Sequence, residues 1–368
     1  MRILHIITSL RTGGAERLVT DLLPRLRARG HEAGVLLFDG TPTPLLDELK
    51  RQNITVYTLG CGARQMRNPL HALRLRRYVR RERFDVVHTH NTPAQLLTAL
   101  AAGKNAPILV TTEHNTFNRR RRWGWYGCVD RWMYGKYDHI ACVGSTTMHN
   151  LMCELGGRWD EGMITVVPNG IDLRRFTGVS ADGSLRTAAE RDCRIAVMVS
   201  SFRAQKDQPT LIRALRHLPD DYRVWFAGDG EGLRHCRLLA EETGVAHRVR
   251  FLGIRSDIPE LLAAADAVVL SSHYEGMSLS SIEGMASGRP FIASDVEGLH
   301  DIVEGAGLLF PHGDDESLAV LLRRVCEDAE FSAGVSSRCR ARAMLCDIDK
   351  AVEDYENIYR KLVNKQTQ

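Results

Sequence analysis

The chain has 368 residues, of which 44% are apolar and 26% are charged. This length predicts two or three domains, and the apolar share excludes a disordered tail. Residues 1–170 hold 24 Lys and Arg against 14 Asp and Glu, whereas residues 171–368 hold 25 against 31. The basic first half favours an anionic partner, which could be a phosphorylated ligand, a lipid surface or a nucleic acid.

The nine cysteines include no Cys-x-x-Cys pair. An odd number without such pairs argues against a disulfide framework and a zinc module, and predicts reduced thiols. The first residues lack the apolar stretch and cleavage site of a signal peptide, and no run of about 18 apolar residues occurs. We therefore expect a cytoplasmic protein without a membrane-spanning segment.

Short apolar runs alternate with amphipathic stretches along the first half. In one such stretch Leu18, Leu22 and Leu26 recur every four residues, which predicts a helix that Pro24 should kink. In another, Ala72 and Val79 share the apolar face of a helix. The apolar runs predict buried strands at Ile3–Ile7, Ala33–Phe38, Thr55–Leu59, Val86–His88, Ile108–Thr111 and Ile140–Val143.

The second half of the sequence shows the same alternation of apolar runs and amphipathic stretches. Its apolar runs predict strands at Ile195–Val199, Arg223–Ala227, Val249–Leu252, Ala267–Leu270, Pro290–Ala293 and Gly307–Phe310. Helical patterns lie between them, at Thr210–Leu218, Leu233–Glu242, Ile258–Ala264, Ser280–Ala286 and Ser317–Asp328. Alternating strands and helices predict an α/β fold with parallel sheets, here two doubly wound domains.

The boundary between the domains is expected within Val166–Asp172, because the tripeptide Pro168-Asn169-Gly170 in this stretch strongly favours a turn. The polar stretch Arg174–Ala189 that follows resembles a linker. These signals predict domains at residues 1–170 and 171–347. A last helix, Ile348–Val363, presents one apolar face and needs a domain to pack on.

Ligands of doubly wound domains bind at the carboxyl ends of the strands. After the first strand, Gly13-Gly14 precedes a helix whose free amides suit a phosphate, although the pair could equally be a tight turn. After the first strand of the second half, Arg203 and Lys206 suit a diphosphate, although they could equally lie in a solvated basic loop.

Two glutamates follow the Ala267–Leu270 strand. If Ser278–Ser287 is helical, Glu283 lies one to two turns inside the helix. Glu275 then lies in the preceding loop, beside the amides of Gly276, Met277 and Ser278. A carboxylate next to a helix N-terminus can bind hydroxyl groups and phosphate together.

The stretch Tyr274–Pro290 resembles the nucleotide-sugar motif of glycosyltransferase family 4, the large retaining family with the GT-B fold. The resemblance continues along the chain at Gly13–Glu16, Asp85–His90, Pro168–Asp172, Gln205-Lys206, Gly228–Gly230 and Phe251–Gly253. It implies two Rossmann-like domains facing across a cleft. Residues 1–170 would bind the acceptor, residues 171–347 the nucleotide-sugar donor, and the helix of residues 348–368 would cross back to the first domain.

The resemblance also implies roles for single residues. Glu275 would contact hydroxyls of the donor sugar, and Glu283 those of the ribose. Arg203 and Lys206 would neutralise the leaving diphosphate, although the family commonly has Gly-Arg where this chain has Ser200-Ser201. The remaining residues implied near the donor are Gly14, His114, Gly253, Ile254, Gly276, Met277, Ser278 and Leu279.

No cofactor and no metal is expected, because fixed cations and helix dipoles can stabilise the charge that develops on the diphosphate. His114 is then a candidate catalytic residue together with Glu275, Lys206 and Arg203; a satisfied histidine at a strand end is the alternative. His90 either lines the cleft or is structural.

A basic and aromatic segment is a candidate contact with an anionic membrane surface. It comprises Arg119, Arg120, Arg121, Arg122, Trp123 and Trp125. Such a contact, peripheral at the inner face of the membrane, would suit a polyprenyl-diphosphate-linked acceptor; a glycan is the other acceptor class. No nucleic-acid-binding motif occurs, so we expect no nucleic-acid partner.

Together with the residues above, the resemblance implies a metal-independent, retaining glycosyltransferase of capsule or exopolysaccharide assembly that uses a UDP- or GDP-sugar. Two alternatives remain open at this stage. One is an isomerase of the nucleotide-sugar 2-epimerase type on the same fold. The other is a non-catalytic partner subunit that binds nucleotide or lipid.

Overall fold

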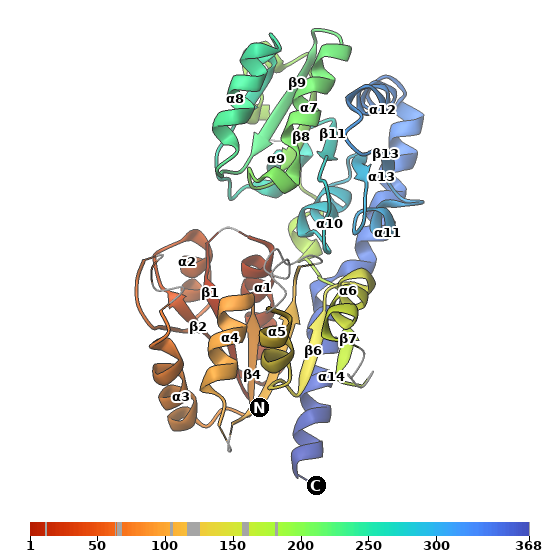
Figure 1. The fold of residues 1–368 in the computed structure, drawn as a ribbon. Coiled ribbons are helices and arrows are strands. Elements are labelled where there is room, and N and C mark those ends of the chain that lie inside the picture. The colour runs from red at the N-terminus through yellow and green to blue at the C-terminus, as the bar shows by residue number, and fades with distance from the viewer. Residues whose placement is uncertain are drawn as a thin grey trace. The chain divides into compact units, whose positions relative to one another are not determined.

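The computed structural model describes residues 1–11, 13–62, 64, 68–103, 106–115, 126–156, 162–180 and 183–367. The chain divides into two compact units, one of Met1–Gly170 with Ile348–Gln368 and one of Ile171–Asp347. Each unit contains one sheet flanked by helices (Figure 1). The predicted fold class, two doubly wound α/β domains, is confirmed.

The sheet of the first unit has seven parallel strands in the order β3-β2-β1-β4-β5-β6-β7. The strands are buried apolar runs, as expected for a parallel sheet that is covered on both faces. They are β1 (Arg2–Ser9), β2 (Glu32–Asp39), β3 (Thr55–Thr58), β4 (Val86–His90), β5 (Ile108–Glu113), β6 (His139–Cys142) and β7 (Ile164–Val166).

Seven α-helices belong to the described part of this unit. Their amphipathic patterns bury one face each, and α2 starts at a Thr43 side chain that accepts a hydrogen bond from the amide of Leu46. Pro24 lies inside α1 without ending it. The helices are α1 (Gly14–Ala28), α2 (Pro44–Arg51), α3 (His71–Glu82), α4 (Thr92–Ala101), α5 (Tyr126–Tyr134), α6 (Ser145–Leu155) and α14 (Ile348–Thr367).

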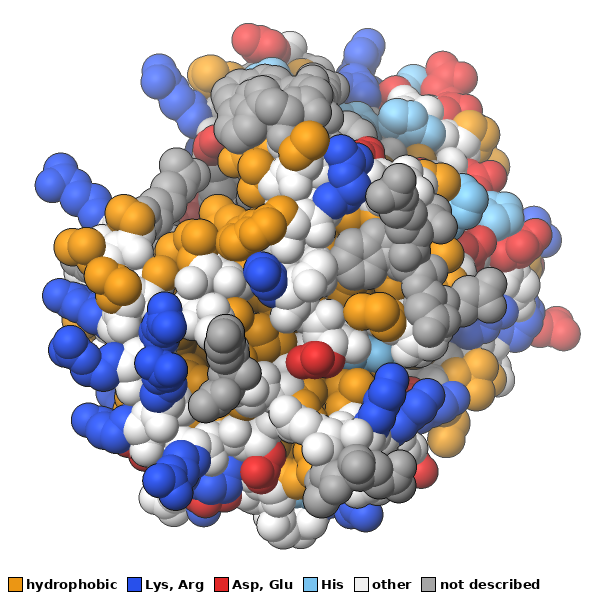
Figure 2. Space-filling model, turned by 60° about the horizontal axis from the view of Figure 1, so that its bottom comes forward, with side chains coloured by type: hydrophobic (Ala, Val, Ile, Leu, Met, Phe, Trp, Pro, Cys, Tyr) orange, Lys and Arg blue, Asp and Glu red, His pale blue; other side chains and the backbone are white. Residues whose placement is uncertain are grey.

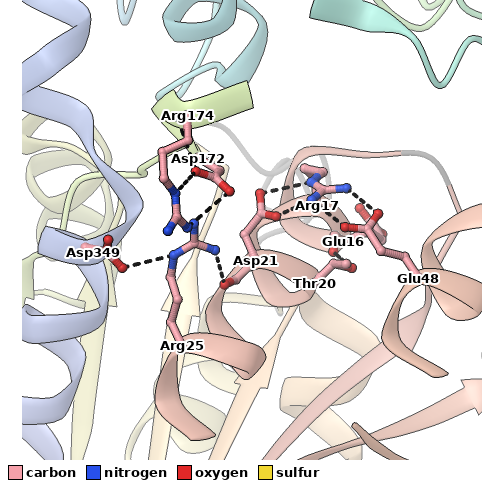
Figure 3. A network of polar contacts seen from close by, with 9 residues as sticks. All are labelled: Glu16, Arg17, Thr20, Asp21, Arg25, Glu48, Asp172, Arg174 and Asp349. Carbon is pink, nitrogen blue, oxygen red and sulfur yellow. Dashed lines mark hydrogen bonds and ion pairs between the residues drawn. The ribbon is translucent and has the colours of Figure 1, made fainter. Parts of the chain in front are cut away.

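The last helix, α14, is fixed to the first unit by polar contacts. Tyr359 and Tyr355 are buried, and their hydroxyls lie 2.5 Å from His88 Nδ1 and 3.0 Å from Thr112 Oγ1. On its other side α14 meets α1, where the Arg25 guanidinium donates to Asp349 at 3.0 Å (Figure 3). The helix thus completes a fold whose other elements end at residue 170.

Glu356 of α14 gives this contact a dependence on pH. Burial alone would raise the pKa of its carboxyl, but hydrogen bonds from Arg360, Arg29 and His31 outweigh burial and lower the pKa to about 2. A carboxyl whose pKa is lower in the folded state adds stability above its unfolded pKa, and this stability is lost as the pH falls towards the folded value.

We therefore expect Glu356→Gln to lower the free energy of unfolding at pH 7 by about 3 kcal/mol, following 1.4 kcal/mol per pKa unit. The difference from the wild type should shrink as the pH falls from about 4.5 towards 2. Urea unfolding at pH 7 and pH 4 measures this. Glu353→Gln is the control on the exposed face of the same helix, and an equal loss in both variants would contradict the expectation.

The sheet of the second unit has six parallel strands in the order β10-β9-β8-β11-β12-β13. They are β8 (Arg194–Val199), β9 (Tyr222–Ala227), β10 (Val249–Phe251), β11 (Ala267–Leu270), β12 (Phe291–Asp295) and β13 (Leu308–Pro311). The helices are α7 (Gln208–Ala214), α8 (Leu233–Glu242), α9 (Ile258–Ala264), α10 (Leu279–Ala286), α11 (His300–Val303), α12 (Asp315–Glu327) and α13 (Ala329–Ala343).

The stretch 174–189, predicted to be a linker, is in part packed onto the second unit. Its Arg186 guanidinium donates to the Ala264 carbonyl and to Asp266, both at 2.9 Å. The 3₁₀ turn Ala188–Glu190 ends in a buried Glu190 carboxylate that accepts from the Trp225 indole at 2.8 Å. The interpretation as a plain linker was therefore wrong for residues 186–189, which lead into the buried Glu190.

Candidate functional site

The order of strands reverses between β1 and β4 in one sheet and between β8 and β11 in the other. In open α/β sheets, ligands bind at the carboxyl ends of the strands beside such a reversal. Gly13-Gly14 follows β1, Lys206 lies in the loop after β8, and Glu275 lies in the loop after β11. The topology thus puts most of the predicted residues in the loops where a ligand is expected.

Lys206 and Glu275 form an ion pair across the reversal in the second unit. The Lys206 Nζ atom lies 2.6 Å from Glu275 Oε1, and the Ser272 hydroxyl donates to the same oxygen at 2.5 Å. The side chains are only 15% and 6% exposed. Removing one partner of such a shielded pair leaves the other charge poorly solvated, which is costly.

The backbone holds the two loops together beside this pair. The Gln205 side chain donates to the Tyr274 carbonyl at 2.8 Å, and the His273 amide donates to the Gln205 carbonyl at 2.8 Å. The Glu275 amide donates to the Glu297 carbonyl at 3.1 Å. The loops after β8, β11 and β12 therefore position Lys206 and Glu275 as one piece.

Gly298 permits the close approach of the third of these loops. Its φ is +83°, and a Cβ atom built on it would lie 2.1 Å from the Glu275 carbonyl oxygen and 2.6 Å from that of Gly276. Only glycine combines this conformation with this contact. Gly298 is thus a residue of the site that sequence reasoning missed, and Ser272 is another.

The segment after Glu275 starts helix α10. Ser278 is the N-cap and has extended backbone angles, without a hydrogen bond from its side chain to the helix. The first amides of a helix have no partner within it and favour an anion. Gly276, Met277, Ser278 and Leu279 therefore lie where a ligand phosphate or hydroxyl can meet these amides, and Glu283 follows half-buried in the helix.

The other residues predicted to lie near the nucleotide-sugar donor are less closely grouped. Arg203 is exposed, and its guanidinium has no ion pair with a residue that the structure describes. Gly253 is tied to the site through Gly228, whose amide donates to the Gly253 carbonyl at 2.7 Å. Ile254 is 56% exposed beside it, as a surface open to a flat ligand would be.

In the first unit, Gly14 is the first residue of α1. One helical turn later, Arg17 pairs with Asp21 and with Glu48, the latter at 2.7 Å (Figure 3). This network joins the start of α1 to α2. It keeps the Arg17 charge paired within the unit, with the Asp21 and Glu48 carboxylates.

Asn91 follows β4 at the other side of the reversal, and sequence reasoning missed it. Its backbone has φ +59° and ψ +156°, a region that costs a residue other than glycine about 1–3 kcal/mol. Its side chain donates to Thr8 Oγ1 at 3.0 Å, while its own oxygen is buried without a partner among the described residues. Such strain often accompanies a ligand site, but no sequence signal indicates it.

Four buried or half-buried histidines gather in the first unit: His5 inside β1, His88 and His90 in β4, and His114 just after β5. His5 Nδ1 lies 3.0 Å from His90 Nε2, and His90 Nδ1 lies 3.1 Å from His114 Nε2. Burial lowers the pKa of His5 to about 3 and that of His114 to about 4, and it lowers the pKa values of His88 and His90 well below the usual range. These imidazoles are therefore neutral near pH 7.

Two groups of described side chains have ligand atoms close enough to hold a metal ion, namely His5 with His88 and His90, and Asp207 with His273 and His312. In the first group, both His88 nitrogens are engaged, by Tyr359 and Thr112. A metal ion there would have to replace these hydrogen bonds.

The predicted membrane contact, Arg119–Arg122 with Trp123 and Trp125, lies outside the described residues. Basic side chains do gather along one side of the face shown in Figure 2, the side on which Figure 1 draws α3. Leu73 on this helix is 68% exposed. The exposed arginines of the helix and its end are Arg74, Arg76, Arg77, Arg80, Arg81 and Arg83. Among the described helices, none has the length and apolar character to cross a bilayer.

Comparison with known proteins gives matches along most of the chain. A family model described as Glycosyltransferase Family 4 matches residues 12–175, and one described as Glycosyl transferases group 1 matches residues 186–342. The lipopolysaccharide core biosynthesis glycosyltransferase LpsD of Rhizobium meliloti is 29% identical over the full length of both chains. An Escherichia coli UDP-Gal:alpha-D-GlcNAc-diphosphoundecaprenol alpha-1,3-galactosyltransferase is 28% identical over 78% of each chain.

Among solved structures, Anabaena HepE in complex with UDP and glucose superposes with a TM-score of 0.86 at 22% identity, covering 98% of this chain and 100% of that one. Sucrose-phosphate synthase from Thermosynechococcus elongatus gives 0.82 at 20% identity, covering 99% of each chain. At this identity the likeness concerns the fold, and it confirms the predicted GT-B architecture of two Rossmann-like domains.

Proposed function

The chain belongs to glycosyltransferase family 4, and from this premise we propose that it transfers a sugar, with retention of configuration, from a UDP- or GDP-sugar to a glycan or lipid-linked acceptor. The observation that carries the proposal is the Lys206–Glu275 pair beside the first turn of α10. It puts a cation, a carboxylate and the start of helix α10 at one strand reversal, as a sugar diphosphate requires.

Each of these groups has a task in the proposed reaction. When the sugar–phosphate bond breaks, negative charge develops on the diphosphate, and the Lys206 ammonium and the α10 amides stabilise it. The Glu275 carboxylate accepts hydrogen bonds from sugar hydroxyls, and Glu283 accepts those of the ribose. Arg203 is exposed and can approach the diphosphate from the solvent side. The proposal requires no metal.

The ion pair adds a feature that the sequence did not predict. Since Lys206 and Glu275 are already 2.6 Å apart, Glu275 holds the lysine in place before the donor arrives. The arriving diphosphate then takes over part of the hydrogen bonding of the lysine, and the carboxylate is left to meet the sugar. The same charge thus orients Lys206 and recognises the donor.

The proposed roles of the units follow the names of the relatives. HepE was solved with UDP, and the name of the Escherichia coli galactosyltransferase gives a diphosphoundecaprenol-linked sugar as its acceptor; both favour UDP and a polyprenyl-diphosphate-linked acceptor here. We assign the donor to residues 171–347 and the acceptor to the first unit, in cell-surface polysaccharide assembly at the inner face of the membrane. The basic surface of α3 fits an anionic lipid layer.

A binding panel tests the donor site without knowledge of the acceptor. The melting temperature is measured with UDP, GDP, ADP and their sugars, without added metal. A ligand present at 100 times its Kd stabilises the native state by about 2.7 kcal/mol, so one nucleotide should give a clear upward shift. Glu283→Ala should reduce this shift, because the ribose hydroxyls lose their acceptor.

The exposed Glu260 of α9 provides the control, since Glu260→Ala should keep the full shift. The absence of a shift with every nucleotide would argue for a non-catalytic subunit. Analysis of the sugar product separates transfer from isomerisation, because an epimerase converts the donor without any acceptor.

A further inference from the structure

Three imidazole rings form a continuous chain of hydrogen bonds in the first unit. The chain runs from His5 in β1 through His90 at the end of β4 to His114 just after β5, with N···N distances of 3.0 and 3.1 Å. His5 and His90 are fully buried, and His114 is half-buried at the strand end. The resemblance that singles out His114 assigns nothing to His5.

The number of protons in this chain is fixed. A neutral imidazole has one N–H group and one nitrogen lone pair. His90 uses both of its nitrogens, so it donates on one side and accepts on the other. All protons in the chain therefore point the same way, either towards His114 or towards His5.

The inner end of the chain distinguishes these two arrangements. His5 Nε2 is buried and has no hydrogen-bond partner among the described residues. If the protons pointed towards His5, this nitrogen would carry a buried N–H group without an acceptor. Buried N–H groups without partners are rarer than buried acceptors without donors, so the protons point towards His114.

A fourth imidazole ring limits how far the hydrogen-bonded rings can rotate. His88 stacks on His90 with ring centroids 4.4 Å apart, and lies 4.9 Å from His5. Both of its own nitrogens are held, by Thr112 at 2.7 Å and by Tyr359 at 2.5 Å. Packed against this fixed ring, His5 and His90 have little room to turn over and exchange their nitrogens.

We propose that His5 is a positioning residue that fixes, through His90, the tautomer of His114 with its proton on Nδ1. The lone pair of His114 Nε2 then accepts from His90, and only the Nδ1–H group is left for a ligand. His114 is thereby a hydrogen-bond donor to an oxygen, such as a sugar hydroxyl, and it cannot take up a proton as a general base. The consequence for sugar transfer rests on the function proposed above.

Nitrogen NMR of the full chain labelled with ¹⁵N-histidine tests the tautomer directly. The signals of His114 are those that disappear in His114→Gln. We expect the wild type to show protonated Nδ1 and unprotonated Nε2 at His114. In His5→Phe, which keeps an aromatic ring without nitrogens, His90 loses its donor and His114 should change to a mixture of tautomers.

Two further variants make the test specific. His5→Asn carries an amide nitrogen on Cγ, as Nδ1 is in histidine, so it can donate to His90 and should restore the wild-type pattern. His139→Phe alters another buried histidine of the same sheet, one that contacts Thr165, and should leave His114 unchanged. If His5→Phe does not fold, the tautomer of His114 in the wild type still tests the proposal, because a proton on its Nε2 would contradict it.

The proposal is overturned if wild-type His114 carries its proton on Nε2, or if His5→Phe leaves the His114 signals unchanged. In turnover, we expect His5→Phe to lower kcat about fivefold, the order of one hydrogen bond, and His5→Asn to recover it. If the wild type transfers no sugar, the proposed function fails, whereas the NMR result still decides the role of His5.

Discussion

Lys206→Ala is expected to lower the turnover of the sugar donor by about 10²–10³-fold, the usual effect of removing one group that stabilises charge in a transition state. The lysine is the shielded cation at the strand reversal, 15% exposed and 2.6 Å from Glu275. Its loss removes the charge that meets the leaving diphosphate. The initial rate of nucleoside diphosphate release, with the nucleotide found in the binding panel, measures the effect.

The same substitution also leaves the Glu275 carboxylate without its cation, so stability must be followed in parallel. Arg186→Ala is the matched control, because Arg186 pairs with Asp266 at 2.9 Å in the same unit but before β11, away from the carboxyl ends of the strands. It should lower the melting temperature and spare turnover. Wild-type turnover in a folded Lys206→Ala would falsify the assigned role.

Gly298→Ala is expected to lower the free energy of unfolding by about 3 kcal/mol. The positive φ of +83° costs an alanine about 1–2 kcal/mol, and overpacking adds about 1–3 kcal/mol. The new Cβ would lie 2.1 Å from the Glu275 carbonyl oxygen, so the loop that carries Glu275 must move. Turnover should therefore fall together with stability, and urea unfolding with donor turnover measures both.

Gly313→Ala separates the two effects of Gly298→Ala, namely the cost of the positive φ and the contact of the new Cβ atom with the Glu275 loop. Gly313 has nearly the same φ, +77°, but a Cβ atom there would meet nothing within 4 Å. It should show only the conformational cost of about 1–2 kcal/mol and keep full turnover. Equal losses in both alanine variants would mean that the contact with Glu275 does not matter.

Buried parallel strands are the part of this fold that the sequence predicts best. They are continuous apolar runs, and the predicted runs overlap β1 to β6 and β8 to β13. Strand β7 is only three residues long and ends where the predicted boundary begins, so no apolar run marks it. Helix α13 was missed because it buries a stripe of small side chains, Val335, Cys339 and Ala343, which lacks the large apolar residues that mark a helix.

The candidate site likewise has residues that the sequence predicts and contacts that it does not. Lys206 and Glu275 stand out because each follows a strand, and the reversal in strand order explains why both loops meet. The sequence did not indicate that they pair with each other, since a contact between residues 69 positions apart has no local signal. For the same reason, the hydrogen-bonded chain from His5 to His114 was not predicted, because its rings come from two strands and the loop after a third.

Helix α14 has a consequence for the order in which the units can form during synthesis. It belongs to the first unit but follows residues 171–347 in the chain. At about 10 residues per second, its synthesis ends roughly 20 seconds after residue 170. Until then His88 and Thr112 lack the tyrosine hydroxyls that they contact in the finished fold. The first unit therefore cannot complete its fold until the end of the chain has been made, although most of its residues are synthesised first.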